Sequence, residues 1–182
     1  MATYGIVLTY KEYEALPADG RRYEIHGGEL SVTPAPSPQH QIIIGNLFIA
    51  LSSHVKSRQL GSVLLAPLDV ILSDTTIVQP DLVYLDPSRL GLISRRGVEG
   101  APTLVVEVLS PATTLIDRTT KHQLYARHGV PYFWLVDPEG RMVEAFVLGP
   151  QGYSLAVRAS GTEPLNPPPF PDIGLIPASL WS

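Results

Sequence analysis

Two acidic residues lie in stretches that otherwise favour buried β-strands. Glu107 interrupts the branched apolar run 104–109, which is typical of a strand covered on both faces. Asp81 stands in a second strand-like run, 78–85. Because a buried, ionised carboxylate without a partner is costly, we expect each of them to be neutralised, paired or bound to a metal.

A divalent metal site is the chemistry that such a pair suggests. If the two strands are neighbours, side-chain alternation lets Asp81 and Glu107 point into one pocket. Mg²⁺ (or Mn²⁺) prefers carboxylate and water oxygens, and proteins often supply only one or two carboxylates. A metal so held would activate water and neutralise charge on a phosphate. Lys121, one helix after Glu107, would orient that water or stabilise the transition state.

The residues around a glycine pair add acidic candidates. A two-residue hairpin turn at Gly27-Gly28 places Glu24, His26 and Glu29 on one face, which is either an acidic wall of the pocket or a solvated surface. The other face, with Leu30 and Val32, is then expected to point to the core.

Two helix positions have both a functional and an ordinary interpretation. His40 begins a long predicted helix, where it would touch a phosphate or a metal-bound water, or merely form a polar helix start. Asp117 lies four residues before Lys121, and this spacing alone favours an ordinary surface ion pair.

The elements that must position these residues follow a mixed α/β pattern. One central mixed β-sheet flanked by helices is the expected architecture, in a single domain over residues 1–182. Its parts are an N-terminal helix and hairpin (1–36), a core (37–158) and an extended C-terminal arm (159–182). Helices are predicted over 9–16, 38–58 and 113–128, and strands over 22–26, 29–33, 63–72, 78–85, 104–109, 132–137, 142–148 and 153–157.

Composition excludes several classes of function. The chain lacks cysteine, so disulfides and thiolate chemistry are excluded. No run is long enough to span a bilayer, and residues 1–20 lack a basic start followed by an apolar stretch, so we expect a cytoplasmic protein without a membrane role. The net charge of −4 argues against a broad nucleic-acid-binding face. Local basic patches are still expected around Arg95 and Arg96, or along the helix with Arg118, Lys121 and Arg127.

Other catalytic schemes find no support in the sequence. It contains no G-x-S-x-G elbow, no glycine-rich phosphate loop and no H-E-x-x-H motif. His54, His122 and His128 are expected on helix surfaces. Asp69 is either a group that supports the site or an exposed acid on an edge strand.

Taken in order, these motifs resemble the Uma family of restriction-endonuclease-like proteins, placed in the PD-(D/E)XK nuclease superfamily. The resemblance covers residues 9–148 and extends loosely to Trp181. It is carried by Tyr23-Glu24…Gly28-Glu29-Leu30, Gln79-Pro80-Asp81-Leu82, Val105-Val106-Glu107-Val108-Leu109-Ser110-Pro111 and Asp117…Lys121…Leu124-Tyr125…Gly129-Val130…Tyr132…Trp134-Leu135-Val136-Asp137-Pro138.

The resemblance implies a restriction-endonuclease-like core that hydrolyses DNA with Mg²⁺ or Mn²⁺. Asp81 and Glu107 would be the metal ligands. The superfamily places its lysine two residues after the second acid, but Leu109 stands there, and the resemblance implies that Lys121 takes its place. In this leading hypothesis Glu29, Glu24 and His40 would be supporting groups.

Two other functions stay open beside a DNA endonuclease. The first is a catalytically inactive binding or assembly module with the same fold, and the second is a metal-dependent hydrolase of a smaller phosphate. The apolar end of the arm, Leu180-Trp181, further suggests a homodimer or higher homo-oligomer.

Overall fold

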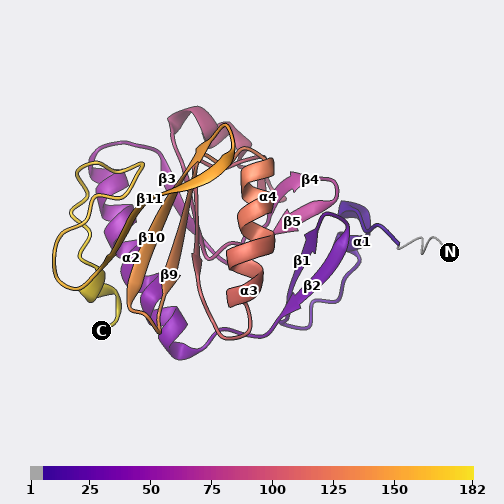
Figure 1. Cartoon of the computed structure of the whole chain (residues 1–182). Coiled ribbons are helices and arrows are strands. Elements are labelled where there is room, and N and C mark those ends of the chain that lie inside the picture. Colours follow the sequence, from indigo (N-terminus) through magenta and orange to yellow (C-terminus); the bar gives the residue numbers. More distant parts are fainter. Residues whose placement is uncertain (1–5) are drawn as a thin grey trace.

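A six-stranded mixed sheet forms the centre of the chain (Figure 1). The structure is a computed structural model and describes residues 6–182; residues 1–5, with which the predicted N-terminal unit begins, lie outside it. Strands β8 and β9 run parallel, and the other neighbours are antiparallel. In spatial order the strands are β11 (Gly152–Ser160), β10 (Met142–Gly149), β9 (Tyr132–Asp137), β8 (Leu104–Val108), β6 (Leu82–Leu85) and β3 (Ser62–Leu65).

A second, five-stranded sheet lies beside the first, where the sequence predicted only one sheet. The predicted strands 63–72 and 78–85 each divide in two, because Pro67 and Pro80 have no N–H to donate within a ladder. Each half then joins a different sheet. In spatial order the second sheet holds β2 (Glu29–Thr33), β1 (Arg22–His26), β5 (Thr76–Val78), β4 (Val70–Ser73) and β7 (Val98–Glu99).

Helices cover both faces of the central sheet, and the predicted helices are confirmed to within a few residues. α1 (Tyr10–Glu14) is short, whereas α2 (Pro38–Ser57) packs along one sheet face. The third helix lies between the two sheets (Figure 1) and consists of α3 (Thr114–Ile116), a π-helical segment (Asp117–Lys121) and α4 (His122–Arg127). No helix within residues 6–182 has both the length and the apolar character needed to cross a bilayer.

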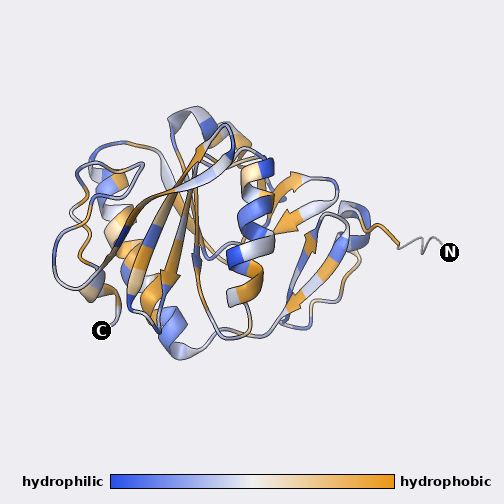
Figure 2. Cartoon of the chain, viewed as in Figure 1, coloured by the Kyte–Doolittle hydropathy of each residue, from blue (hydrophilic) through white to orange (hydrophobic). Residues whose placement is uncertain are grey.

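The core consists of two apolar layers separated by the central sheet. The inner strands carry long hydrophobic stretches in Figure 2. On one face Val106 and Trp134 pack with Leu47 of α2. On the other face Val105 and Phe133 pack with Tyr125 of α4. This covering of both faces explains the unbroken apolar strands in the sequence.

The C-terminal arm folds back onto its own chain. Leu165, Phe170 and Leu180 are buried in the layer that contains α2. The indole Nε1 of Trp134 donates a hydrogen bond to the carbonyl of Pro168 at 2.7 Å. The expected self-association therefore loses its premise, because the end of the arm already finds apolar partners within the chain, and the oligomer stays a prediction.

Phe170 provides a test of this packing. It lies 4.9 Å from the ring of Tyr84 and 6.0 Å from that of Trp134, measured between centroids. Phe170→Ala should lower the free energy of unfolding by about 3–5 kcal/mol, because it leaves a cavity in the core. Urea denaturation measures this loss. Ile49→Ala, at an exposed position of α2, is the control and should change stability by less than about 0.5 kcal/mol. Equal stability of the two variants would show that the arm is not docked.

Candidate active site

Asp81 and Glu107 lie opposite each other, Asp81 directly before strand β6 and Glu107 in the neighbouring strand β8. The register pairs Val83 with Val105 and Leu82 with Val106, so one further step brings Asp81 beside Glu107. Asp81 is the residue before β6 rather than a member of the strand, because Pro80 interrupts the ladder. Both side chains are buried and line one pocket, as their strand positions predicted.

The ammonium group of Lys121 lies among three carboxylates. Its Nζ is 3.1 Å from Oε1 of Glu107, 3.0 Å from Oε1 of Glu24 and 3.5 Å from Oδ1 of Asp117. All four side chains are buried. The prediction that Asp117 and Lys121 form a surface pair is therefore wrong: their common helical face points inward to the site.

The π-helical segment contributes to this geometry. It spans Asp117–Lys121, so the two helix residues that form the buried ion pair lie on one wider turn. Four residues further on, Tyr125 donates a hydrogen bond from its hydroxyl to Oε1 of Glu107 at 2.6 Å. Glu107 Oε1 thus accepts from both Tyr125 and Lys121.

Asp81 is held by three different donors. Its Oδ2 accepts from the backbone N–H of Val108 at 2.8 Å and lies 3.2 Å from Nε2 of His40. Its Oδ1 accepts from two nitrogens of Arg22, each at 3.2 Å. His40 also lies 2.9 Å from the carbonyl of Val108 through Nε2. The predicted His40 therefore reaches the site, through Asp81.

Glu24 lies in β1 of the second sheet and connects this sheet to the site through Lys121. Its Oε1 accepts from the backbone N–H of Gln79 at 2.6 Å, and its Oε2 lies 3.0 Å from Nε2 of His26. Gln79 is held in turn by Asp69, which accepts from its side-chain amide at 2.8 Å. Asp69 therefore stabilises the loop before Asp81 and lies outside the pocket itself.

The pocket and its surroundings hold more carboxyl groups than permanent cations. The pocket volume is about 260 Å³, and the loop 33–37, the N-terminus of α2 and the segment 110–113 complete its walls. There are four buried acids, Asp81, Glu107, Asp117 and Glu24, but only two permanent cations, Lys121 and Arg22. Oδ1 of Asp117 is buried and accepts no hydrogen bond from the described residues, although Lys121 is near.

Because these acids outnumber the cations, their pKa values differ widely. Burial, reinforced by neighbouring carboxylates, raises the pKa of Glu107 to about 8 despite the ion pair with Lys121. Burial would also raise the pKa of Glu24, but Lys121, His26 and the Gln79 amide outweigh it and hold this pKa at about 2.

Asp81 and His40 stabilise each other's charge. Burial opposes a charged Asp81, but His40, Arg22 and the Val108 N–H hold its pKa below the ordinary value. Burial likewise opposes a charged His40, and the Asp81 carboxylate raises the pKa of that imidazole. An anionic Asp81 beside a readily protonated Glu107 is an arrangement that a metal-binding or acid–base site can use.

Glu29 does not reach the pocket. The predicted hairpin register is confirmed, with Glu24 opposite Ser31 and His26 opposite Glu29. Glu29 nevertheless lies next to the turn, exposed, in a separate surface hollow on the outer side of the π-helical segment. Glu24 reaches the site only through its contact with Lys121, and neither Glu24 nor His26 lines the pocket itself.

Several other sequence expectations need correction. Leu30 and Val32 are exposed instead of facing the core. His54 is buried beneath the C-terminal arm, 3.5 Å from Asp172, and His122 is half-buried among aromatic rings. These histidines are not free surface groups, and none lines the pocket.

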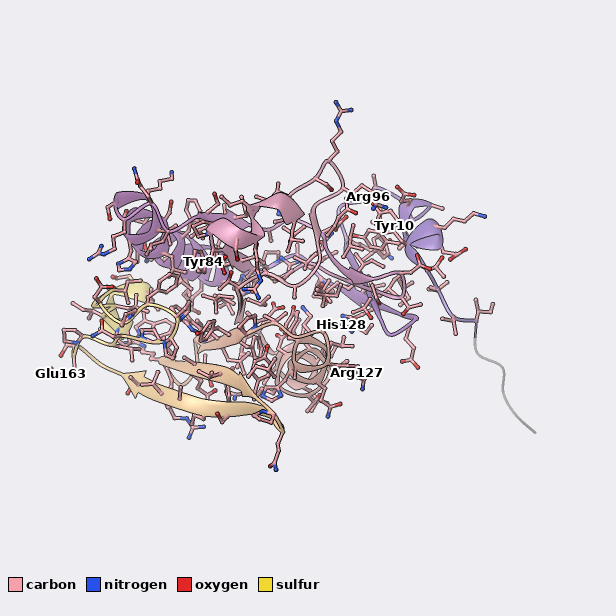
Figure 3. All side chains as sticks on the ribbon, turned by 90° about the horizontal axis from the view of Figure 1, so that it is seen from above. Tyr10, Tyr84, Arg96, Arg127, His128 and Glu163 are labelled. Atoms are coloured by element: carbon pink, nitrogen blue, oxygen red, sulfur yellow. The ribbon has the colours of Figure 1, made fainter. Side chains whose placement is uncertain are left out.

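The expected basic patches are partly neutralised, although Arg95 and Arg127 form no ion pair with the described residues. Arg96 is paired with Glu99 and lies over the ring of Tyr10, which Figure 3 shows beside it. Arg118 lies 2.6 Å from Glu144 and 3.3 Å from an oxygen of Asp137. Lys121 belongs to the site interior, and Arg127 stands at the end of α4 (Figure 3).

Two residues of the site were not assigned to it from the sequence. Arg22 precedes Glu24 by two positions, so strand alternation alone places them on the same face. Tyr125 follows Lys121 by four positions, which is one helical turn. Both signals exist in the sequence, but they become specific only when the partners from other elements are known.

The chain is similar to proteins that are described as putative nucleases. A family model described as "Putative restriction endonuclease" (Uma2) matches residues 10–178. A crystal structure from Anabaena variabilis ATCC 29413, titled as a putative nuclease belonging to DUF820, shares 21% identity and covers 96% of this chain and 97% of that chain, with a TM-score of 0.75. This likeness confirms the predicted α/β fold. No curated protein sequence matches the chain.

The raised pKa of Glu107 predicts how stability depends on pH. The folded protein keeps a proton on Glu107 up to about pH 8, whereas the unfolded chain releases it near the ordinary pKa of 4.5. Stability of the metal-free protein should therefore fall as pH rises from about 5 to 8. Glu107→Gln keeps an acceptor for Tyr125 and Lys121 but cannot titrate. It should become more stable than the wild type across this window, by on the order of 1–4 kcal/mol at its upper end.

Urea unfolding at several pH values in the presence of a chelator measures the difference. The raised pKa values of His40 and Asp117 also make stability fall as pH rises, but these two groups are present in both proteins. The difference between the proteins therefore reports on Glu107. A constant difference between the two proteins from pH 5 to pH 8 would show that Glu107 is ionised throughout.

Proposed function

The chain belongs to the Uma2 family of restriction-endonuclease-like proteins, and from this membership we propose that it is a metal-dependent endonuclease that hydrolyses phosphodiester bonds of DNA. Family membership supports a nuclease. The observation that supports this active site is the meeting of Asp81, Glu107 and Lys121 in one pocket, with a Lys121–Glu107 distance of 3.1 Å.

The residues present fit a divalent cation. Among residues 6–182 no group of three or more histidine, cysteine or acidic side chains is arranged to hold a metal. Mg²⁺ and Mn²⁺, however, need only one or two carboxylates and keep several waters. Asp81 and Glu107 are such a pair, and the acid excess, together with the Asp117 oxygen that accepts no hydrogen bond from the described residues, favours an added positive charge. The bound ion would supply a more acidic water and positive charge at the phosphate.

The surrounding side chains have distinct roles in this proposal. Lys121 would hold a water for attack on phosphorus, or donate to the oxygens that gain charge as the P–O bond to the leaving group breaks. Tyr125 would fix the orientation of Glu107 through its hydrogen bond, and His40 would fix that of Asp81 through the 3.2 Å contact between Nε2 and Oδ2. We further propose that the enzyme acts in the cytoplasm, where DNA is accessible.

Cleavage of DNA tests the assignment. With Mn²⁺ or Mg²⁺ the wild type should nick plasmid DNA, and a chelator should abolish the activity. Asp81→Asn, Glu107→Gln and Lys121→Met should each lower the rate by about 100-fold or more, because each removes charge from the reacting centre. Gel electrophoresis of supercoiled plasmid gives the rates. Glu29→Gln is the control and should cleave like the wild type, since Glu29 lies outside the pocket. Wild-type activity in Glu107→Gln would remove that residue from the site.

A binding or assembly module is the second candidate function. It is favoured because Arg22, His40 and the Val108 N–H already contact the Asp81 carboxylate. This carboxylate is therefore compensated without a metal.

Calorimetric titration with Mn²⁺ separates the two functions. An enzyme should bind the ion, and Glu107→Gln should weaken that binding by about 10-fold or more. No heat of binding in the folded wild type, together with no cleavage, would favour the module.

A further inference from the structure

Arg22 makes an incomplete contact with the site. Both of its terminal nitrogens donate to the same oxygen of Asp81, at 3.2 Å, instead of forming a fork across both oxygens. A guanidinium group carries five N–H donors. Within residues 6–182 its hydrogen bonds go only to Asp81, so the other donors stay available.

Arg22 is also the Asp81 partner that is easiest to displace. The Val108 N–H is fixed in the backbone of β8, and the His40 ring is buried and held by a second contact to Val108. The Arg22 side chain is long and 21% exposed, whereas that of Asp81 is 2% exposed. Any cation that approaches Oδ1 of Asp81 meets this guanidinium first.

There is space for the guanidinium outside the pocket. Arg22 lines the site pocket and also a neighbouring surface hollow that contains Gly20, Pro34 and Gln41. Its Cα stays fixed, because Arg22 is paired with Thr33 across the hairpin. A rotation of the side chain alone therefore transfers the charge from the pocket to its mouth.

We propose that Arg22 is an exchangeable substrate-binding residue, which holds Asp81 in the metal-free protein and turns to a phosphate of the substrate when a divalent ion takes its place. This inference rests on the proposed nuclease function. A guanidinium and a divalent ion repel each other on one oxygen, so binding of the ion releases the arginine. The planar fork of donors then matches a phosphodiester better than the single carboxylate oxygen it leaves.

The proposed exchange predicts that removal of the guanidinium strengthens metal binding but weakens the binding of DNA. In Arg22→Gln the ion no longer competes with a guanidinium, so Mn²⁺ affinity measured by calorimetry should rise about tenfold. The KM for DNA cleavage should also rise about tenfold, because a phosphate contact is lost. A merely structural role would weaken both. Arg21→Gln is the matched control: the Arg21 side chain is 67% exposed, pairs with Asp19 on the surface, and should leave both quantities unchanged.

A second variant, Arg22→Lys, controls for misfolding of Arg22→Gln. It keeps a cation beside Asp81, so Mn²⁺ affinity should stay near the wild-type value, while the loss of the fork should still raise KM.

The outcomes separate this inference from the proposed function. If the wild type binds Mn²⁺ and cleaves DNA but Arg22→Gln binds the ion no more tightly, or both Arg22 variants keep the wild-type KM, the exchange is overturned and the nuclease stands. If neither the wild type nor any variant binds Mn²⁺ or cleaves, the nuclease and the exchange fall together.

Discussion

The buried ammonium group of Lys121 is the interaction on which the site depends. It bridges Glu107 of the central sheet and Glu24 of the second sheet, from a helix that lies between them. Burial disfavours the charge, but three carboxylates together raise the pKa of Lys121 above its ordinary value. Removal of the ammonium group from such a cluster typically costs about 3–5 kcal/mol, because the remaining buried carboxylates lose their compensation. The same contact therefore joins the two sheets and assembles the pocket.

Even with Lys121 present, the acid cluster is only partly compensated. Glu107 keeps its proton near neutral pH, and an oxygen of Asp117 is left without a hydrogen bond from the described residues. A core chosen for stability alone would replace such groups with apolar side chains of similar volume. In the proposed function, a bound ion of positive charge would recover part of the free energy that the burial of four acids around one pocket costs.

Local periodicity in the sequence predicted the helices, most strands and the hairpin register, but it missed the division of the predicted strands 63–72 and 78–85, and prediction failed where distant elements meet. The apolar runs around Asp81 and Glu107 indicated strands, and neighbouring strands then align the two acids. The glycine pair fixed the hairpin register, and helical spacing gave α2. The inward direction of Asp117 and the contact of Arg22 depend on how a helix and two sheets pack, which no short-range pattern contains. The same holds for the C-terminal arm, whose prolines indicate an extended chain but not the surface that it covers.

The distribution of positive charge constrains how a nucleic acid can bind. Cations that lie along the helix or near α1, such as Arg118 and Arg96, already have carboxylate partners. Each phosphate contact made by a free lysine or arginine adds to affinity and to its salt dependence. A protein with net charge −4 and so many paired cations gains little from that effect. In the proposed function, attraction of the substrate would therefore depend on the pocket itself, where a bound divalent ion and Arg22, the one guanidinium that lines the pocket, would both act on the same phosphodiester.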